Sequence, residues 1–392
     1  MTSSLQTVPV GVLFSTSGPY AALGREGLAG AMLAIAEINA DDQYGLKLAA
    51  QVRDPRGSTE QYAAMAADIV GTTGARHILG CTTSWSRKEV IPVLEKSATM
   101  LWYSCPYEGF EAHDQVIYLG ACPNQHILPL LAFALPRFGT NGYLVGSNYI
   151  WGWETNRIAR DIIEAAGGPV AGERYVPLGD VDIGRIIEEI RTKRPAFVVN
   201  TLIGPSSYAF LAAYHALGQA DQTFSQDVRP VLSCNFAESE VAQLGAVAAG
   251  QYAISPYFQS LATPENRRFL DTAKQFAPDA VHISAFFAQA YAAVHLLAAG
   301  LAGAGTDATD AVREATKFVS MTAPFGPIEI DDATNHAVLT PRIARAVVGG
   351  FDIVSDMETA IRPDPYLAYS PVAVASDPAA PSPRVSHLRV IK

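Results

Sequence analysis

Cysteine is scarce in this chain. Its 392 residues include only four cysteines, at positions 81, 105, 122 and 234, and no two of them stand in a C-x-x-C spacing. That number is too small for a disulfide-stabilised scaffold, and the spacing does not fit a zinc site. The H-E-x-x-H motif of zinc enzymes is also missing. We therefore expect no bound metal, and thiols that pack in the core in reduced form.

Positive charge is scarce as well. Lys and Arg number 28 against 38 for Asp and Glu, which gives a formal net charge of −10, and no basic run occurs. Phosphate contacts need a concentrated surplus of Lys and Arg, so we expect no direct binding to nucleic acid. The longest apolar stretch, residues 285–305, is interrupted by Gln289 and His295. This pattern is typical of a helix packed in a core, so we expect no membrane insertion.

The N-terminal residues MTSSLQTVPVGVLF contain neither a charged n-region nor an apolar h-region before the first expected strand. Both regions are needed for a secretory signal. The expectation is a cytoplasmic protein. A periplasmic or other extracytoplasmic location is the alternative if a leader has been removed.

The motifs of common enzyme classes are missing. The chain has no G-x-S-x-G elbow, no G-x-G-x-x-G and no G-x-x-x-x-G-K-[ST]. Cys81 and Cys105 have no histidine at a spacing that implies a catalytic base. We interpret Glu108, Glu111 and Glu154 as helix caps or surface groups rather than as an acid/base pair. The sequence favours recognition over catalysis and implies no cofactor.

Strand and helix patterns alternate along the first 105 residues, and a second series of the same kind starts near residue 126. In the first series, strands are expected at 8–14, 46–54, 76–81 and 99–105, and helices at 24–40, 60–73 and 86–98. In the second, strands are expected at 141–148 and 173–178 and helices at 157–167 and 208–218. A further helix followed by a strand is expected over 183–204. This order predicts an α/β fold with two parallel sheets, each covered by helices on both faces.

The pattern changes after residue 250. A strand at 252–258 precedes a helical stretch over 265–303, and two short strand patterns follow at 326–332 and 342–349. These late strands are too few for a third domain, so we expect them to complete the two earlier sheets. The Pro-rich residues 371–392 are predicted to form an extended C-terminal tail.

The segment GCTTSWSRK, residues 80–88, places a cluster of hydroxyl groups where an expected strand meets an expected helix. The cluster consists of Thr82, Thr83, Ser84 and Ser86, with Trp85 among them. Either Thr83 or Ser84 suits the helix N-cap, which leaves backbone N–H groups of the first turn free for a polar ligand. Capping explains one hydroxyl of the four. A ligand site and a structural cap both remain open.

Polar and aromatic residues follow other expected strands too. The carboxyl ends of parallel strands lie at the same edge of a sheet, where ligands of such folds bind. Tyrosine and tryptophan suit a small enclosed ligand because they combine an apolar wall with a polar group. The candidates at these ends are Tyr103, Cys105, Pro106, Tyr149, Trp151, Leu202, Ser233 and Asn235.

The segments GCTTSWSRKEVIPV, YSCPYEGFE, CPNQ, GSNYI and IRPDPY resemble the amide sensors of the AmiC type and the urea-binding proteins of ABC transporters. Both are a subgroup of the type I periplasmic-binding-protein family, which includes the branched-chain amino-acid binding proteins. The resemblance implies two doubly wound lobes joined by a three-segment hinge, with the ligand in the cleft. It places lobe 1 at 8–121 plus 252–327 and lobe 2 at 124–249 plus 330–370.

The resemblance also implies roles for individual residues. Ser84 and its neighbours should hold the polar group of the ligand, helped by Tyr103 and Cys105. From the second lobe, Tyr149 and Trp151 should close over it. The chain departs from the AmiC pattern at Thr82, Cys105 and Trp151, where those proteins carry tyrosine, threonine and tyrosine.

Amino-acid binders of the wider family place an acidic side chain of the second lobe against the ligand's ammonium group. The matching loop here reads LSCNFAESE, with Ser233 and Asn235 where that acid is expected. An ammonium group buried without a charged partner is costly by several kcal/mol. We therefore expect a small neutral amide or urea-like ligand, and an α-amino acid is disfavoured.

Three functions follow from these expectations. The first is a sensor whose lobes close on the amide and thereby control an RNA-binding antiterminator protein. The alternative is the substrate-binding component of an ABC transporter for short amides, urea or branched-chain amino acids, with a permease as partner. The third is an amidase or other hydrolase, which sustained ammonia release from an amide would reveal. Whether the protein forms a homo-oligomer stays open.

Overall fold

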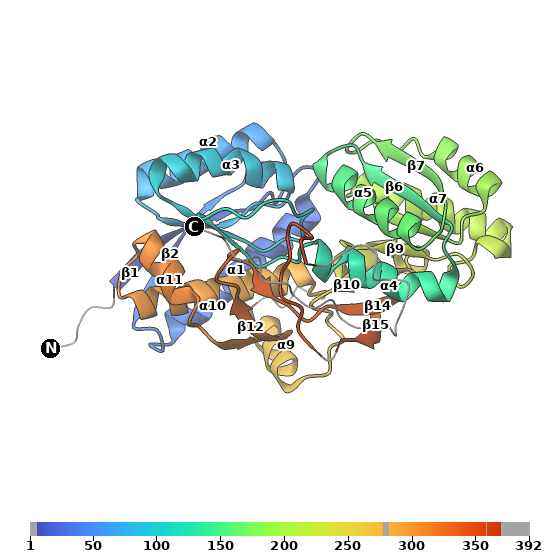
Figure 1. The fold of residues 1–392 in the computed structure, drawn as a ribbon. Coiled ribbons are helices and arrows are strands. Elements are labelled where there is room, and N and C mark those ends of the chain that lie inside the picture. The colour runs from blue at the N-terminus through green and yellow to red at the C-terminus, as the bar shows by residue number, and fades with distance from the viewer. Residues whose placement is uncertain (1–5, 277–281, 358, 370–392) are drawn as a thin grey trace, which may run out of the picture.

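Two mainly parallel β-sheets, each covered by helices, lie side by side in the computed structural model (Figure 1). The structure describes residues 6–276, 282–357 and 359–369. The expected C-terminal tail at 371–392 lies outside the described residues.

The first sheet has the strand order β2-β1-β3-β4-β5, and all its neighbouring strands pair in parallel. Short, fully buried strands such as β4 carry the continuous apolar runs typical of parallel sheets. The elements in chain order are β1 (Gln6–Leu13), α1 (Ala21–Ala40), β2 (Leu46–Arg53), α2 (Thr59–Thr73), β3 (His77–Gly80), α3 (Ser84–Ser97), β4 (Met100–Tyr103) and β5 (Val116–Tyr118). This series confirms the expected alternation of strands and helices.

The second sheet has the order β15-β14-β10-β9-β8-β6-β7. Its elements are α4 (Ile127–Phe138), β6 (Gly142–Ser147), α5 (Ile150–Ala165), β7 (Val170–Val176), α6 (Gly184–Lys193), β8 (Phe197–Thr201), α7 (Pro205–Ala220), β9 (Val231–Ser233), α8 (Glu238–Leu244), β10 (Tyr252–Ser255), β14 (Arg342–Val347) and β15 (Gly350–Asp356). The five strands β6 to β10 pair in parallel with their neighbours in this sheet. Strand β14 is antiparallel to both β10 and β15.

The region after β10 differs from the expectation in two ways. The single helical stretch at 265–303 is two helices, α9 (Pro264–Phe276) and α10 (Ala285–Ala304), followed by α11 (Thr309–Thr316). The strand expected at 326–332 does not extend either large sheet. It becomes β12 (Gly326–Ile330) in a small antiparallel sheet with β11 (Met321–Ala323) and β13 (Ala337–Val338).

The chain passes between the two lobes at several points, which we call crossings. The later crossings lie further along the chain than the resemblance implied. β10 pairs with β9 and β14, so residues 252–255 belong to the second sheet rather than to the start of the lobe 1 segment 252–327. Residues Ile328, Ile330 and Leu339 pack in the core of the first sheet, so the chain returns to the second sheet only before β14. The chain first passes between the two sheets after residue 121, because Ala121 packs in the first core and Ile127 in the second.

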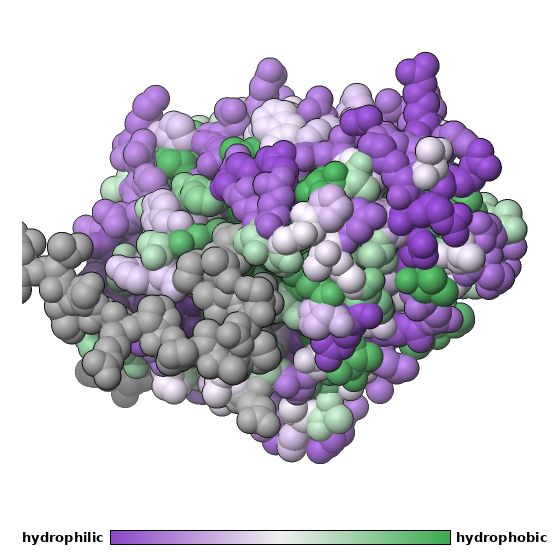
Figure 2. Space-filling model, turned by 45° about the vertical axis from the view of Figure 1, so that its right-hand side comes forward, coloured by the Kyte–Doolittle hydropathy of each residue, from purple (hydrophilic) through white to green (hydrophobic). Residues whose placement is uncertain are grey.

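Helix α10 is the one helix among the described residues that is long and apolar enough to cross a membrane. It packs against α1 in the core of the first sheet, as the sequence predicted for this stretch. On the face of the molecule in Figure 2, hydrophobic residues form small separate patches among hydrophilic ones.

Candidate ligand-binding site

The strand order reverses once in each sheet, between β1 and β3 in the first and between β6 and β8 in the second. Loops diverge at such reversals, which leaves a crevice outside the carboxyl ends of the strands. The two reversals face each other across a narrow space that we call the cleft pocket. Its lining residues are Leu23, Thr82, Thr83, Ser84, Tyr103, Cys105, Pro106, Tyr149, Trp151, Ile203, Asn235 and Phe286.

Nine of the twelve residues proposed from the sequence line this pocket. The other three lie next to it. Trp85 contacts Tyr149 with ring centroids 5.3 Å apart and forms part of the rim between the lobes. The backbone oxygen of Leu202 accepts from the Asn235 amide, and the Ser233 hydroxyl donates to the Asn235 side-chain oxygen. Leu202 and Ser233 therefore orient Asn235.

Capping accounts for two of the four clustered hydroxyls, and not for one as expected. The Thr83 hydroxyl accepts from Ser86 N at 3.2 Å, and Thr83 N donates to the Ser86 hydroxyl at 3.0 Å. This reciprocal pair is a capping box at the start of α3. The left-handed conformation of Cys81 (φ 66°) turns the chain from β3 into this cap. The first turn of α3 thus points its N–H groups and the positive end of its dipole at the cleft pocket.

The other two hydroxyls also have protein partners. Thr82 Oγ1 and Tyr62 OH are 2.9 Å apart, and the Ser84 hydroxyl donates to Glu108 Oε2. A ligand that binds Ser84 therefore competes with, or adds to, a contact with a buried carboxylate.

Two lining residues have polar atoms without any partner. Tyr103 OH and Trp151 Nε1 are both buried, and neither forms a hydrogen bond. Tyr103 lies at the end of β4 in the first lobe, and Trp151 lies in the first turn of α5 in the second. A buried donor left without an acceptor costs about 1–3 kcal/mol. Because both residues line the same pocket, a ligand acceptor between the lobes would satisfy both.

A buried ionic network lies behind the hydroxyl cluster. Arg87 is fully buried and contacts Glu108 at 3.4 Å and Glu111 at 2.6 Å, while Lys88 contacts Glu111 at 2.8 Å. The Arg87 guanidinium also lies 4.7 Å from the ring centroid of Tyr103. Glu108 and Glu111 are therefore not helix caps or surface groups, which corrects the interpretation made from the sequence. Burial alone would raise the pKa of Glu111, but Arg87 and Lys88 lower this pKa to about 2.

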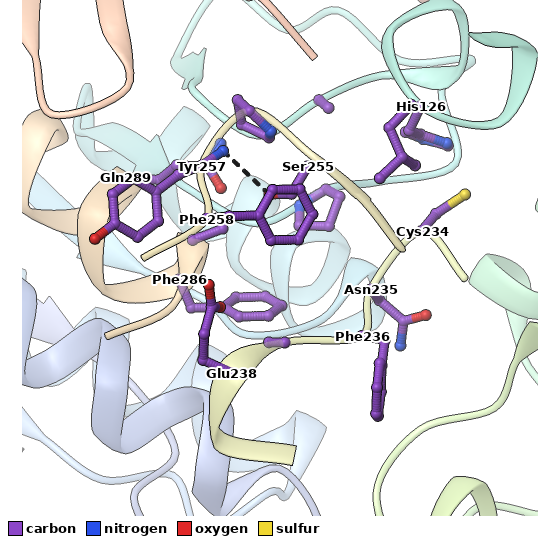
Figure 3. A pocket seen from close by; sticks show the side chains of 16 residues that line it. His126, Cys234, Asn235, Phe236, Glu238, Ser255, Tyr257, Phe258, Phe286 and Gln289 are labelled. Carbon is purple, nitrogen blue, oxygen red and sulfur yellow. Dashed lines mark hydrogen bonds between the residues drawn. The ribbon is translucent and has the colours of Figure 1, made fainter. Parts of the chain in front are cut away.

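A second space of about 430 Å³ adjoins the cleft pocket and shares Pro106, Asn235 and Phe286 with it. We call it the hinge chamber because Ala121 and Ser255, at two of the crossings, line it. Figure 3 shows its aromatic walls and one ionisable carboxyl group, that of Glu238, pointing toward the ring of Phe286. The full lining is Pro106, Ala121, His126, Cys234, Asn235, Phe236, Ala237, Glu238, Ile254, Ser255, Pro256, Tyr257, Phe258, Ala285, Phe286 and Gln289.

Glu238 corrects the argument against α-amino acids. That argument rested on the lack of an acid at positions 233 and 235, but the same segment brings an acid into the adjoining chamber three residues later. Burial raises the pKa of Glu238 to about 8, and its Oε1 accepts from Gln259 N at 2.7 Å. The second lobe therefore does place an acid beside the cleft pocket. Glu238 by itself is neutral near pH 7, and a cationic group of a ligand beside it would favour its ionised form.

The sequence did not single out Leu23, Ile203 or Phe286, which supply apolar walls of the cleft pocket. Apolar residues of this kind carry no signal that separates pocket walls from core. No group of three or more histidine, cysteine, aspartate or glutamate side chains that could hold a metal ion occurs in the described part of the chain.

The lobes approach each other closely at Gly204. A Cβ added to Gly204, which has φ 59°, would lie 2.9 Å from the backbone oxygen of Pro19 in the first lobe. We expect Gly204→Ala to weaken ligand binding at least about 10-fold, because a steric conflict of about 1.4 kcal/mol in the closed form already has that effect. Titration calorimetry with a ligand of the protein checks this.

The matched control is Gly245→Ala. Gly245 has almost the same backbone conformation (φ 56°, ψ −125°) as Gly204 (φ 59°, ψ −135°), but nothing lies within 4 Å of its added Cβ. Both substitutions introduce similar backbone strain, so only the contact between the lobes differs. Equal affinities of the two variants would mean that this contact is not part of the bound form.

Comparison with known families gives one match to most of the chain. The model of the family described as periplasmic binding protein domain matches residues 8–372. The chain is also 26% identical over 338 residues to the Leu/Ile/Val-binding protein homolog 6 of Brucella abortus (strain 2308). That alignment covers 84% of this chain and 85% of the relative.

Two solved structures illustrate the similarity of fold. A solute-binding protein of an ABC transporter from Rhodopseudomonas palustris HaA2, in complex with p-hydroxybenzoic acid, has a TM-score of 0.80 and 21% identity, covering 90% of this chain and 96% of that one. The substrate-binding protein of a branched-chain amino acid transporter from Streptococcus pneumoniae, in complex with isoleucine, has a TM-score of 0.77 and 19% identity, covering 91% and 100%.

Proposed function

Because the chain belongs to the periplasmic binding protein domain family and has the type I fold, we propose that it is the solute-binding component of an ABC transporter. In this role its lobes close on a small molecule and deliver it to a permease. The named relatives support this role more than the amide sensor, which was the first expectation. The likeness to the AmiC and urea-binding subgroup is not confirmed, and no comparison supports an antiterminator partner.

We propose that the solute carries a carboxylate. The observation that carries this step is the pair of unpartnered donors, Tyr103 OH and Trp151 Nε1, that line one pocket from opposite lobes. The N–H groups at the start of α3 add further donors and a favourable dipole for an anion. No acidic side chain lines the cleft pocket among the described residues. Such a donor-rich, acid-free space suits an anionic acceptor better than a neutral amide, which also needs acceptors for its N–H groups.

The body of the solute would lie against the apolar walls. Leu23, Ile203 and Phe286 offer contacts for an aliphatic or aromatic group next to the carboxylate. The ligands named for the two similar structures, isoleucine and p-hydroxybenzoic acid, both combine a carboxylate with such a body. The proposed solute class is therefore an amino acid or an aromatic acid.

A thermal-shift screen tests this proposal. The panel compares isoleucine, leucine, p-hydroxybenzoate and benzoate with acetamide, propionamide and urea. A ligand present at 100 times its dissociation constant stabilises the folded chain by about 2.7 kcal/mol. We expect such a shift from at least one carboxylate and none from the neutral amides. If only acetamide or urea stabilised the protein, the solute would be a neutral amide or urea-like compound and not a carboxylate.

The proposed role operates outside the cytoplasm. The cytoplasmic location expected from the N-terminal residues stays a prediction, and cell fractionation followed by detection of the protein would test it.

A further inference from the structure

Three carboxyl groups lie near the hinge chamber at the boundary between the lobes. Glu238 of the second lobe and Phe286 of the first line the same chamber, and Glu26 binds Ser284, two residues before Phe286. Glu26 lies on α1 of the first lobe, and Glu238 and Glu240 lie in the first turn of α8 of the second. Glu238 and Glu240 are buried, and the Oε1 atom of Glu26 is shielded from solvent without a partner. Glu26 accepts hydrogen bonds from the N–H and hydroxyl of Ser284, and Glu240 accepts from Ala237 N.

None of these three carboxyl groups forms an ion pair with any residue that the structure describes. Arg25 is the cation that acts on Glu26, but its Nη1 donates to Thr16 O and it is exposed. The other titratable groups that face the cluster are neutral phenols, Tyr208 near Glu240 and Tyr257 near Glu238. Arg25 thus acts on Glu26 from an exposed position, and no cation among the described residues acts on Glu238 or Glu240. This differs from the Arg87 network, where each acid has a cation.

Such a cluster is unfavourable when ionised and acceptable when protonated. Burial, together with the charge of Glu26, raises the pKa of both Glu238 and Glu240 to about 8. Burial also raises the pKa of Glu26, although Ser239, Ser284 and Arg25 partly counteract this. When the lobes separate, water reaches these groups and Glu26 moves away from α8. Their pKa values then return toward the ordinary value of about 4.3.

We propose that Glu26, Glu238 and Glu240 form a proton-dependent latch between the lobes, which is protonated in the closed form and opens when the three groups ionise. The latch goes beyond the proposed transport role, since it governs closure whatever the solute is. A carboxyl group with a raised pKa in the closed form stabilises that form at low pH. The stabilisation is fully present below about pH 4 and is lost as the pH rises through about 8.

The test measures closure directly, without any solute. Fluorophores for single-molecule energy transfer are attached after Lys96→Cys on α3 and Arg185→Cys on α6, two exposed positions in different lobes. The four native cysteines are buried and should not react. We expect the ratio of closed to open molecules to fall at least about 10-fold between pH 6 and pH 9, since each coupled carboxyl changes it up to about tenfold per pH unit.

Glutamine mimics a protonated glutamate, so the triple variant Glu26→Gln, Glu238→Gln, Glu240→Gln should stay closed at both pH values. If this variant does not fold, Glu238→Gln alone should lose part of the pH response. The control Glu164→Gln, at an exposed position on α5, should keep the whole response. A wild-type ratio that does not change with pH, or a glutamine variant with the wild-type response, would overturn the latch. If no carboxylate stabilised the protein in the thermal-shift screen, the proposed function would be contradicted. The test of the latch would not be affected, because it uses no solute.

Discussion

Arg87→Ala should lower the free energy of unfolding by about 3–5 kcal/mol, the usual result of removing one partner from a buried ion pair. Arg87 has no exposed surface, and Glu108 is also buried. The substitution would leave Glu108 and Glu111 with only Lys88 to balance two negative charges. It would also remove the cation packed against Tyr103 and so disturb the wall of the cleft pocket. Urea denaturation followed by far-UV circular dichroism measures the loss.

Arg157→Ala is the matched control for this effect. Arg157 also contacts two carboxylates, Glu154 at 2.9 Å and Asp161 at 3.0 Å, but its side chain is 37% exposed. Exposed ion pairs contribute about 0–1 kcal/mol each. If Arg87→Ala and Arg157→Ala destabilised the protein equally, the Arg87 network would not be the buried support of the site.

Tyr103→Phe is expected to weaken solute binding about 10-fold to 100-fold while leaving the ligand-free protein as stable as before. The Tyr103 hydroxyl has no partner in the protein, so its removal breaks no internal hydrogen bond. A hydrogen bond to a charged acceptor contributes about 1.5–3 kcal/mol, which corresponds to the stated loss of affinity. Trp151→Phe should also weaken binding because Trp151 Nε1 is unpartnered, but it leaves a cavity in the core and so lowers stability as well. Calorimetric titration and urea denaturation together provide the two readouts.

The control for this pair is a tyrosine with the opposite properties. Tyr214 OH donates to Arg229 O at 2.8 Å in the second lobe and does not line the cleft pocket. Tyr214→Phe should therefore lose about 1 kcal/mol of stability and keep its affinity. A Tyr103→Phe variant that is destabilised like Tyr214→Phe but binds normally would show that the hydroxyl serves the fold and not the solute.

Much of the fold was accessible from the sequence because local patterns determine it. The alternation of buried strands and amphipathic helices predicted both series of βαβ units. The boundary between α9 and α10 was missed although the sequence contains a sign of it. Ser284, whose hydroxyl accepts from Phe286 N, caps α10 at the point where the expected helix runs on. Reading the apolar run as one helix ignored this cap.

The crossings between the lobes were misplaced for a different reason. β10 joins the second sheet through pairs such as Tyr252 with Leu232 and Ala253 with Ala344, and these partners are far apart in the chain. Sequence patterns show that residues 252–255 form a strand, but they do not show which sheet the strand extends. The same holds for β12, whose antiparallel partners decide that it forms a separate small sheet.

The sequence was enough to bring together most residues of the cleft pocket, which we propose as the site, but not to predict its chemistry. Strand-end position was enough to find Tyr103 and Trp151, because parallel sheets bring those ends together. The pairing of Ser84 and Arg87 with Glu108 depends on a tertiary contact over more than twenty residues. Lack of a partner is likewise a property of the folded chain, so no pattern could mark Tyr103 OH and Trp151 Nε1 as the free donors.

A crystal structure of the chain with the carboxylate that gives the largest thermal shift would test the central claim most directly. The account predicts the carboxylate in the cleft pocket, with oxygens about 3 Å from Tyr103 OH and Trp151 Nε1 and close to the first turn of α3. A carboxylate bound elsewhere, with both donors still unpartnered in a closed cleft, would contradict it.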